Sequence, residues 1–321
     1  MFSQNGNPTP LQAAHMPLIT SRMYFWYADW NLYSKSVIMK CKSLSPQKLL
    51  VVLAILLFSS SLVKAAPAYN AADAIKTILR YKVSASSVVA RSASEATEMK
   101  ATAARTAAMA ARAAKRAEMK MILATATSIY DEMDLEDSGL SRQAFESAWT
   151  GYYKLRKQGL LRKSSVLSIC DFSQSSSNQR LYVIDVRNRK VLYRTYVSHG
   201  INSGEEFANV FSNKMESCKS SLGFYITKQT YNGANGMSLR IEGVDKGYNN
   251  NAYKRAIVIH GASYVSQRIL RKYGVMGTSF GCPAVPSEMA SQIIPVVKNG
   301  SCFYIYYPSK KYLAHSPVLN S

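Results

Sequence analysis

Two short segments of the sequence carry side chains that could do covalent chemistry. The apolar run 257–259 leads directly into His260, and a loop of small residues ending in Gly281 leads into Cys282. A thiol that can pass its proton to a neighbouring imidazole forms the nucleophile and base of cysteine enzymes. We therefore predict Cys282 as a nucleophile and His260 as its general base.

The residues beside this pair suit a reaction at a carbonyl group. Gly281 lets a substrate approach the backbone closely, and the N–H groups of Gly281 and Cys282 would then form an oxyanion hole. Gly261 places a second small residue beside the histidine. A helix expected to begin at Pro286 would stabilise the thiolate and lower the thiol pKa.

Each of these residues also has an ordinary structural explanation. A single cysteine in an apolar setting is most often a small core residue, and a histidine at a strand end is often structural. The cysteine spacings match no zinc site. A calcium loop starting at Asp134 would need Glu at its twelfth position, where Phe145 stands. The sequence therefore predicts neither a metal nor a cofactor.

The elements that must position the pair form a β-rich domain. Short alternating strands are expected at 166–171, 180–185, 190–197, 223–227, 238–242, 255–260 and 301–307. One helix, over 286–298, lies between Cys282 and the last strand. We expect a mainly β fold, with a sandwich or barrel-like catalytic domain preceded by an α-helical N-terminal region.

Two helical segments precede the strands. Residues 71–130 are rich in alanine, the best helix former, and indicate a solvated spacer; a partner-binding coiled coil is the alternative, although the heptads are poor. Ser141 is placed to cap a second helix within 131–158. Its expected apolar face consists of Phe145, Ala148, Trp149, Tyr152 and Leu155.

The N-terminal part carries an export signal. Residues 39–65 combine a basic start, an uncharged apolar run over 49–58 and small residues at a cleavage site, as in a secretory signal peptide. The run is short for a membrane span, which needs about 20 residues, so an uncleaved anchor through 49–63 is the alternative. Residues 1–38 are then a non-native extension, with translation starting at Met39, or a cytosolic tail.

Export implies a periplasmic or cell-envelope location for the residues after the signal. We expect an Ala-rich helical spacer over 66–127 and a catalytic domain with an N-terminal helix over 128–321. An oxidising compartment allows disulfides. Because Cys282 must stay reduced, at most one bridge can form among Cys170, Cys218 and Cys302.

The charge of the chain is concentrated in its C-terminal half. Of the formal charge of +21, residues 151–321 contribute 23 Lys and Arg against 8 Asp and Glu. A basic surface attracts polyanions such as an anionic cell-wall surface. No zinc finger, RNP-type motif or basic-plus-heptad pattern supports nucleic acid as the partner. A generally basic protein without a specific partner is the alternative explanation.

Several unusual strings in one order carry a resemblance to a known family. Residues 128–318 resemble the murein L,D-transpeptidase catalytic domain family, a branch of the YkuD-like L,D-transpeptidases. The matching strings are DFSQSSSNQRLYVIDV (171–186), TYVSHGINSG (195–204), FSNKMESCKSSLGFYIT (211–227), YNGANGMSLRIEG (231–243), RAIVIHGASYVS (255–266) and SFGCPAV (279–285).

The resemblance implies a reaction on peptidoglycan stem peptides. The Cys282 thiolate would attack the carbonyl between diaminopimelate and D-alanine, and a side-chain amine or water would resolve the acyl-enzyme. His260 would act as base and then as acid. Ser279 and Gly281 would shape the site. His199 and Gly200 match the loop before the substrate groove, where His199 would have a supporting role.

The sequence departs from the family pattern around the cysteine. Phe280 and Ala284 stand where common members carry His and Arg, and Thr278 stands where the closer branch carries Arg. No Arg follows Cys282, so these positions do not supply the usual recognition of the substrate carboxylate, and a Lys or Arg elsewhere could substitute. The candidates in the basic half are Arg240, Arg255 and Arg268.

Other classes of protein account for fewer of these features. In sortases the catalytic histidine also precedes the cysteine along the sequence, but these enzymes need an Arg after the cysteine. Papain-like peptidases place the cysteine before the histidine, the reverse of this order. A non-catalytic wall-binding module, which Thr278 and Phe280 favour, is the remaining alternative.

Overall fold

The computed structural model describes residues 71–321. The chain divides into two compact units, Met1–Met99 and Lys100–Ser321, and every candidate site residue lies in the second. The expected signal peptide at 39–65 and the stretch before it lie outside the described residues. Within 71–321, no helix combines the length and apolar character that a membrane span needs.

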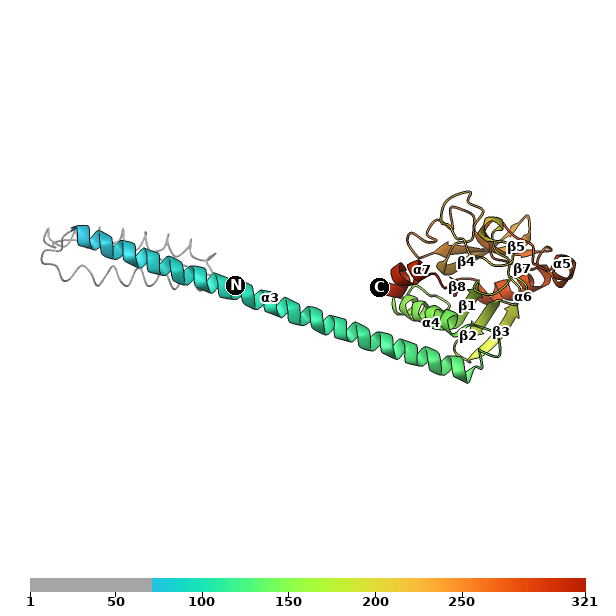
Figure 1. Ribbon diagram of the computed structural model, residues 1–321, viewed down its shortest axis with the longest axis horizontal. Coiled ribbons are helices and arrows are strands. Elements are labelled where there is room, and N and C mark those ends of the chain that lie inside the picture. Colours follow the sequence, from blue (N-terminus) through green and yellow to red (C-terminus); the bar gives the residue numbers. More distant parts are fainter. Residues whose placement is uncertain (1–70) are drawn as a thin grey trace, which may run out of the picture. The chain divides into compact units, whose positions relative to one another are not determined.

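The alanine-rich segment is helical, as predicted. Helix α3 runs over Ala71–Glu132 (Figure 1), and its side chains from 75 to 117 are exposed. The last turns differ: Ile122, Ala126 and Tyr130 are buried in the core of the second unit. The expected spacer over 66–127 therefore ends in residues that also pack as part of that core.

Helix α4, Arg142–Lys157, begins directly after Ser141, the residue that the sequence predicts as its N-cap. The Ser141 hydroxyl accepts a hydrogen bond from the Ala144 N–H at 3.3 Å. The residues before it form hydrogen-bonded turns, with Asp134 at φ 49°, so the helical unit expected over 131–158 starts later. All five residues of the predicted apolar face are buried.

Within residues 71–321, eight strands form one mixed sheet, which confirms the mainly β domain expected after the helical region. The strands are β1 (Val166–Asp171), β2 (Leu181–Asp185), β3 (Lys190–Thr195), β4 (Gly223–Gly233), β5 (Gly236–Gly243), β6 (Val258–Ala262), β7 (Ala284–Pro286) and β8 (Cys302–Tyr306). Their order in the sheet is β3-β2-β1-β8-β4-β5-β6-β7.

The two edges of this sheet approach each other. The segment that follows β3 forms isolated bridges with the region of β7, at Ser198–Ala284 and Gly200–Ser279. These bridges nearly close the sheet into a barrel. They also bring the loop at 198–200 against the loop that carries Cys282.

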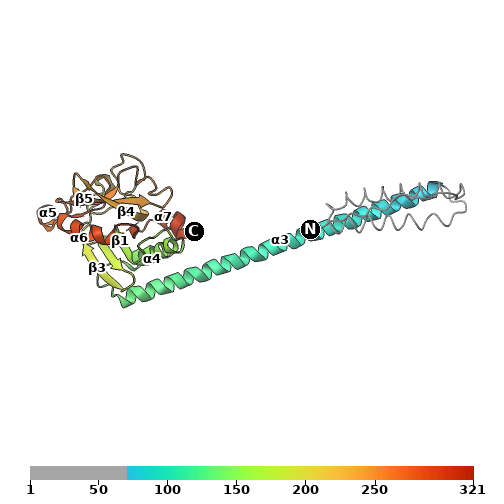
Figure 2. The same cartoon turned by 180° about the vertical axis from the view of Figure 1, so that it is seen from behind.

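Helices cover the sheet and end the chain. α4 packs against β1 and β8, and α6 (Ser287–Val297) packs against β5 and β6 (Figures 1 and 2). The other helical elements are η2 (Ile201–Ser203), α5 (Gln267–Tyr273), α7 (Lys310–His315) and α8 (Pro317–Asn320). The helix expected over 286–298 is confirmed as α6, whereas α5, α7, α8 and the three-residue β7 were not anticipated.

One strand is displaced from its expected position. The sequence predicts a strand over 255–260, but β6 covers Val258–Ala262. The preceding residues form successive turns, including Arg255 N–H to the Asn251 carbonyl at 2.9 Å, and Ala256 has a φ of 54°. As a result, His260 lies in the middle of a strand and not at its end.

The core between α4 and the sheet depends on one close approach. The rings of Phe224 and Tyr304 stack with centroids 4.0 Å apart. Gly151 of α4 lies directly over this stack, because a Cβ there would fall 2.0 Å from Cζ of Phe224. A glycine in the middle of a helix is unfavourable in itself, so the packing distance explains its presence here.

We expect Gly151→Ala to lower the free energy of unfolding by about 1–3 kcal/mol, because the added methyl overpacks the ring. Chemical denaturation of the full chain measures this change. The matched test repeats the substitution in a Phe224→Leu background. The packing explanation requires Gly151→Ala to cost less unfolding free energy when the Phe224 ring is absent. An equal cost in both backgrounds would therefore contradict it.

A buried carboxylate fixes the C-terminal helices to the sheet. Asp245 accepts hydrogen bonds from the Phe224 N–H at 2.9 Å and the Tyr312 hydroxyl at 2.8 Å through Oδ2. Its Oδ1 accepts from the Ser316 hydroxyl at 2.6 Å and the Val318 N–H at 3.2 Å. Asp245 has no exposed surface, so these four donors stabilise its charge in the core.

Candidate active site

Strand pairing brings the predicted nucleophile and base together. β6 and β7 are parallel neighbours, and His260 lies opposite Ala284 in their register. Cys282 is two residues before Ala284, which places it at the level of Val258, and the Val258 N–H points to the Cys282 Sγ at 3.5 Å. His260 is buried and Cys282 is half-buried. No hydrogen bond joins these two described side chains directly.

The imidazole of His260 has a defined tautomer. Its Nδ1 lies 2.9 Å from the carbonyl oxygen of Gly261. A carbonyl oxygen only accepts hydrogen bonds, so Nδ1 carries the proton and Nε2 of the neutral ring keeps its lone pair. Gly261 itself faces α6, because a Cβ there would lie 3.0 Å from the Cα of Ser287. Nε2 is therefore the nitrogen able to take a proton.

The electrostatics of the thiol differ from the prediction. Burial raises the pKa of Cys282 above its ordinary value, while the Val258 N–H and the charge of Arg255 act in the opposite direction. The expected lowering by a helix N-terminus is wrong, because β7 separates Cys282 from α6, which begins at Ser287. A thiol with a raised pKa depends on a base for its activation.

The loop before the cysteine is held by Ser279. Its hydroxyl accepts from the Gly281 N–H at 3.0 Å and donates to the Cys282 carbonyl at 2.7 Å. The Gly281 N–H is thus occupied, and the prediction that it donates to an oxyanion is wrong for this conformation. The Cys282 N–H has no partner among the described residues and remains available. Gly281 has a φ of 117°, in the region that favours glycine.

Among the three candidate arginines, Arg255 lies at the site. A Cβ on Gly281 would fall 3.3 Å from its Nη2. Its guanidinium donates to the carbonyls of Ser212 at 2.8 Å and Lys219 at 2.6 Å, and to two serine hydroxyls. By contrast, Arg240 lies over the Tyr231 ring, 4.6 Å from its centroid. Arg268 lies on α5, a helix without buried residues.

The loop at His199 and Gly200 packs against this centre. The Gly200 N–H donates to the Ser220 hydroxyl at 3.0 Å, and that hydroxyl contacts the Gly281 carbonyl at 3.3 Å. A Cβ on Gly200 would lie 2.9 Å from the Cα of Gly281. Ser220 therefore connects the two loops, a role that its serine-rich surroundings in the sequence did not indicate.

His199 is a buried neutral residue in the wall of the site. Its Nδ1 accepts from Nη2 of Arg180 at 2.8 Å, which leaves Nε2–H to donate to the Gly204 carbonyl at 3.0 Å. Burial and the adjacent Arg180 charge lower the pKa of His199 to about 4. Arg180 is fully buried, and burial lowers its pKa to about 10. No pattern in the sequence indicated this arginine.

His199 should make stability fall in mildly acidic solution. Its pKa is about 4 in the folded protein, below the roughly 6.5 of an unfolded histidine, so the unfolded chain binds the proton more readily. The corresponding stability is complete above pH 6.5 and is lost as the pH falls toward 4. The loss reaches about 3 kcal/mol. Denaturation curves at pH 7 and 5 measure it.

His199→Gln is the matched control for this pH effect, because a glutamine can accept from Arg180 and donate to Gly204 without titrating. We expect the variant to lose less stability than the wild type over the same pH interval. Equal pH dependence in the two proteins would contradict the assignment.

The three residues that depart from the family pattern differ in their exposure to solvent and in their surroundings. Phe280 is 77% exposed, and Ala284 is buried in β7. Thr278 lines a cleft beside the loop.

The four described cysteines, Cys170, Cys218, Cys282 and Cys302, are all free. Within residues 71–321, no cluster of three His, Cys, Asp or Glu side chains has the arrangement of a metal site.

Comparison with known families identifies the domain. Residues 136–306, just over half of the chain, match the L,D-transpeptidase catalytic domain. The chain belongs to this family of cell-wall proteins. No curated protein matches the chain as a whole or in part.

The solved structures that match the chain share little sequence with it. An L,D-transpeptidase from Mycobacterium smegmatis is 13% identical with a TM-score of 0.28; the match covers 44% of this chain and 59% of the other. The cell-shape-determining protein Pgp2 from Campylobacter jejuni is 16% identical with a TM-score of 0.25, over 46% of this chain and 45% of the other. The chain thus spans about half of each of these relatives.

Proposed function

We propose that this chain is an exported cysteine acyltransferase that acts on peptidoglycan stem peptides. It would carry out L,D-transpeptidation through an acyl-enzyme on Cys282, with L,D-carboxypeptidase activity when water is the acceptor. The observation that supports this proposal is the parallel register of β6 and β7: His260 lies in β6, and Cys282 lies two residues before β7 with its Sγ 3.5 Å from the Val258 nitrogen of β6. Family membership supplies the substrate class.

The first half of the reaction forms the acyl-enzyme. Nε2 of neutral His260 accepts the thiol proton of Cys282, and the sulfur attacks the carbonyl carbon between diaminopimelate and D-alanine. The Cys282 N–H stabilises the negative oxygen that develops there. The C–N bond then breaks, the proton on His260 passes to the leaving nitrogen, and D-alanine departs. A thioester on Cys282 remains and His260 is neutral again.

The contact between His260 and the Gly261 carbonyl favours this cycle. The imidazolium formed in the first step keeps its Nδ1–H bonded to that carbonyl at 2.9 Å. Because Nδ1 stays protonated through this bond, Nε2 is the nitrogen that takes and returns the proton. Arg255 adds a fixed positive charge near the sulfur and would attract the carboxylate of the substrate. The net positive charge of residues 151–321 suits an anionic wall.

A non-catalytic wall-binding module is the second candidate. It is favoured by the missing direct hydrogen bond between Cys282 and His260 and by the exposed Phe280 side chain. Hydrogen bonds of catalytic groups often tighten only when substrate binds, so the free geometry is compatible with either function.

Muropeptide analysis separates the two functions. The full chain and its Cys282→Ala variant are expressed in a bacterial host that lacks L,D-transpeptidases. An enzyme yields new diaminopimelate–diaminopimelate cross-links or trimmed tripeptides with the wild type alone. Identical muropeptides from both proteins, with both proteins retained on isolated walls, would reject the enzyme and support the binding module.

The proposed location is testable in the same host. We propose that residues 39–65 direct export and that the domain acts in the periplasm or cell envelope, cleaved from the signal or anchored through 49–63. Fractionation followed by N-terminal sequencing of the exported protein distinguishes a cleaved from an anchored form. Recovery of the protein only from the cytosol would reject export.

A further inference from the structure

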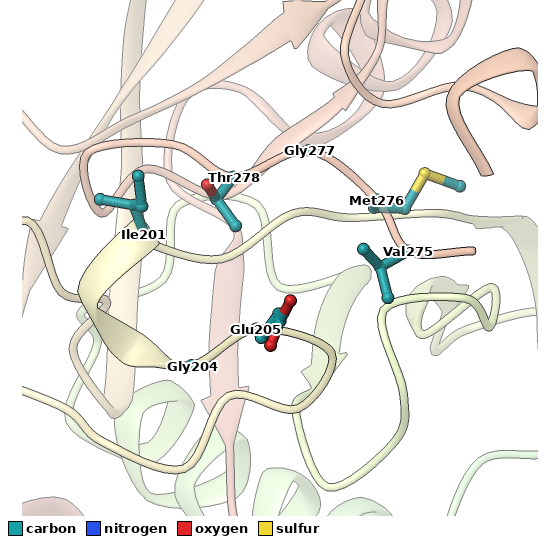
Figure 3. A pocket seen from close by; sticks show the side chains of 7 residues that line it. All are labelled: Ile201, Gly204, Glu205, Val275, Met276, Gly277 and Thr278. Carbon is teal, nitrogen blue, oxygen red and sulfur yellow. The ribbon is translucent and has the colours of Figure 1, made fainter. Parts of the chain in front are cut away.

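A cleft opens beside the loop that carries the cysteine. It has a volume of about 310 Å³ and lies between the 201–205 loop and the 275–278 segment (Figure 3). Its lining residues are Ile201, Gly204, Glu205, Val275, Met276, Gly277 and Thr278. The two walls are joined next to the cleft, since the Ile201 N–H donates to the Ser279 carbonyl at 2.7 Å. Thr278 in one wall belongs to the same loop as Cys282, so the cleft lies beside the loop that carries the candidate nucleophile.

The cleft has apolar walls and two unpartnered polar groups. Ile201, Val275 and Met276 contribute aliphatic surface, and Figure 3 shows the Glu205 side chain at the centre of the lining residues. In the described part of the chain, the Glu205 carboxylate makes no hydrogen bond or ion pair, and neither does the Thr278 hydroxyl. A site of this kind fits a ligand with an aliphatic stem and a cationic end.

Several other carboxylates in residues 151–321 are already engaged. Glu206 accepts a hydrogen bond from the Ser175 hydroxyl at 2.6 Å, and Glu242 pairs with Lys228. Asp171 and Asp245 are buried and hydrogen-bonded. Within the described residues, Glu216 and Glu288 are exposed and also have no bonded carboxylate, but neither lines the cleft, so Glu205 is the acidic residue that faces it.

We infer that this cleft is the subsite that receives the acyl acceptor, a primary ammonium on an aliphatic chain, and that Glu205 selects it over water. Glu205 pairs with the ammonium, the Thr278 hydroxyl accepts a second N–H bond, and the apolar wall covers the methylene groups. The inference rests on the proposed function, because an acceptor is needed only if an acyl-enzyme forms on Cys282.

The transfer step balances with groups already assigned. The bound ammonium gives one proton to Nε2 of neutral His260, and the nitrogen lone pair forms the new C–N bond at the thioester carbonyl. The electron pair of the C–S bond returns to the Cys282 sulfur. A second N–H proton passes to that thiolate, which leaves a neutral amide and a free thiol. His260 then releases its proton to water.

The test measures how the acyl-enzyme divides between an amine and water. The full chain is given a stem tetrapeptide as donor and Nα-acetyl-lysine amide as acceptor, and amide product is measured against hydrolysed tripeptide. We expect Glu205→Gln to lower this ratio about fivefold, the discrimination expected from one exposed ion pair. D-Alanine release should stay unchanged, because it belongs to the first half of the reaction.

The matched controls separate this subsite from general charge effects. Glu206→Gln removes the adjacent carboxylate outside the cleft and should leave the ratio unchanged. Hydroxylamine, a small neutral nucleophile, should compete with water equally in all variants. A ratio in Glu205→Gln equal to that of the wild type, with normal D-alanine release, would overturn the inference and leave the proposed function intact.

A binding measurement tests whether the cleft binds an ammonium ligand even if no acyl-enzyme forms. Nα-acetyl-lysine amide is titrated into Cys282→Ala protein, with Nα-acetyl-norleucine amide as the uncharged control. We expect NMR shifts at the amides of Gly204, Gly277 and Thr278 with the lysine probe, lost when Glu205→Gln is added. Absence of these shifts would overturn the inference. Absent D-alanine release from the wild type would instead reject the proposed function.

Discussion

Replacing His260 by alanine is expected to lower the rate of Cys282 acylation by about 10²–10⁴-fold at neutral pH, the range for loss of a general base. The thiol has a pKa above its ordinary value because it is buried, so little thiolate exists at pH 7 without a base. Intact-mass measurement of Cys282 acylation by a carbapenem, over time, reports the rate without requiring a natural substrate.

The pH dependence of the variant has a definite sign. Without His260, only preformed thiolate reacts, so the rate should rise about tenfold per pH unit until the pH reaches the raised thiol pKa. The wild type should show a flatter profile, because Nε2 accepts the proton during the reaction. Cys282→Ala is the blank for labelling elsewhere. A His260→Ala protein with the rate and profile of the wild type would remove His260 from the mechanism.

Replacing Asp245 by alanine is expected to lower the free energy of unfolding by about 4 kcal/mol or more. The change leaves two buried backbone N–H groups and two hydroxyls without their acceptor, each at a cost of about 1–3 kcal/mol. Tyr312 and Ser316 can turn to other partners, but the N–H groups of Phe224 and Val318 cannot. Thermal and denaturant unfolding of the full chain measures the loss.

Two substitutions calibrate the effect of Asp245. Asp245→Asn keeps one acceptor oxygen and turns an NH₂ group toward the remaining donors, so it should lie between the wild type and Asp245→Ala. Asp137→Asn alters an exposed carboxylate and should change the unfolding free energy by less than about 0.5 kcal/mol. A similar small change for Asp245→Ala would show that the carboxylate does not hold the C-terminal helices.

The candidate catalytic pair and most strands were predictable because their signals are local. His260 and Cys282 are identified by residue type, order and the small residues beside them, and β1, β2 and β8 by their apolar runs. The start of α4 was predictable from the capping hydroxyl of Ser141. Each of these signals lies within a few residues of the element that it specifies.

The remaining features depend on contacts between distant segments, on local hydrogen bonds that residue types do not reveal, or on elements too short to show a pattern. Arg255 was one of three equivalent arginines until the fold placed it against Gly281 and the 212–221 loop. The Gly281 N–H was expected to be free, but a hydroxyl two residues away competes for it. β7 has only three residues and ends in proline, and α5 has seven, so neither is long enough for a periodic pattern to indicate it.

The position of β8 also determines when the domain can complete its fold. This strand, the last in the sequence, lies in the middle of the sheet, parallel to β1 on one side and antiparallel to β4 on the other. A nascent chain that has not yet reached Cys302 exposes unpaired edges on both β1 and β4, which are templates for aggregation. Such a chain cannot fold stepwise as it is synthesised; its sheet joins only after the final strand has emerged. A premature stop codon before Cys302 would therefore leave two half-sheets and no assembled protein.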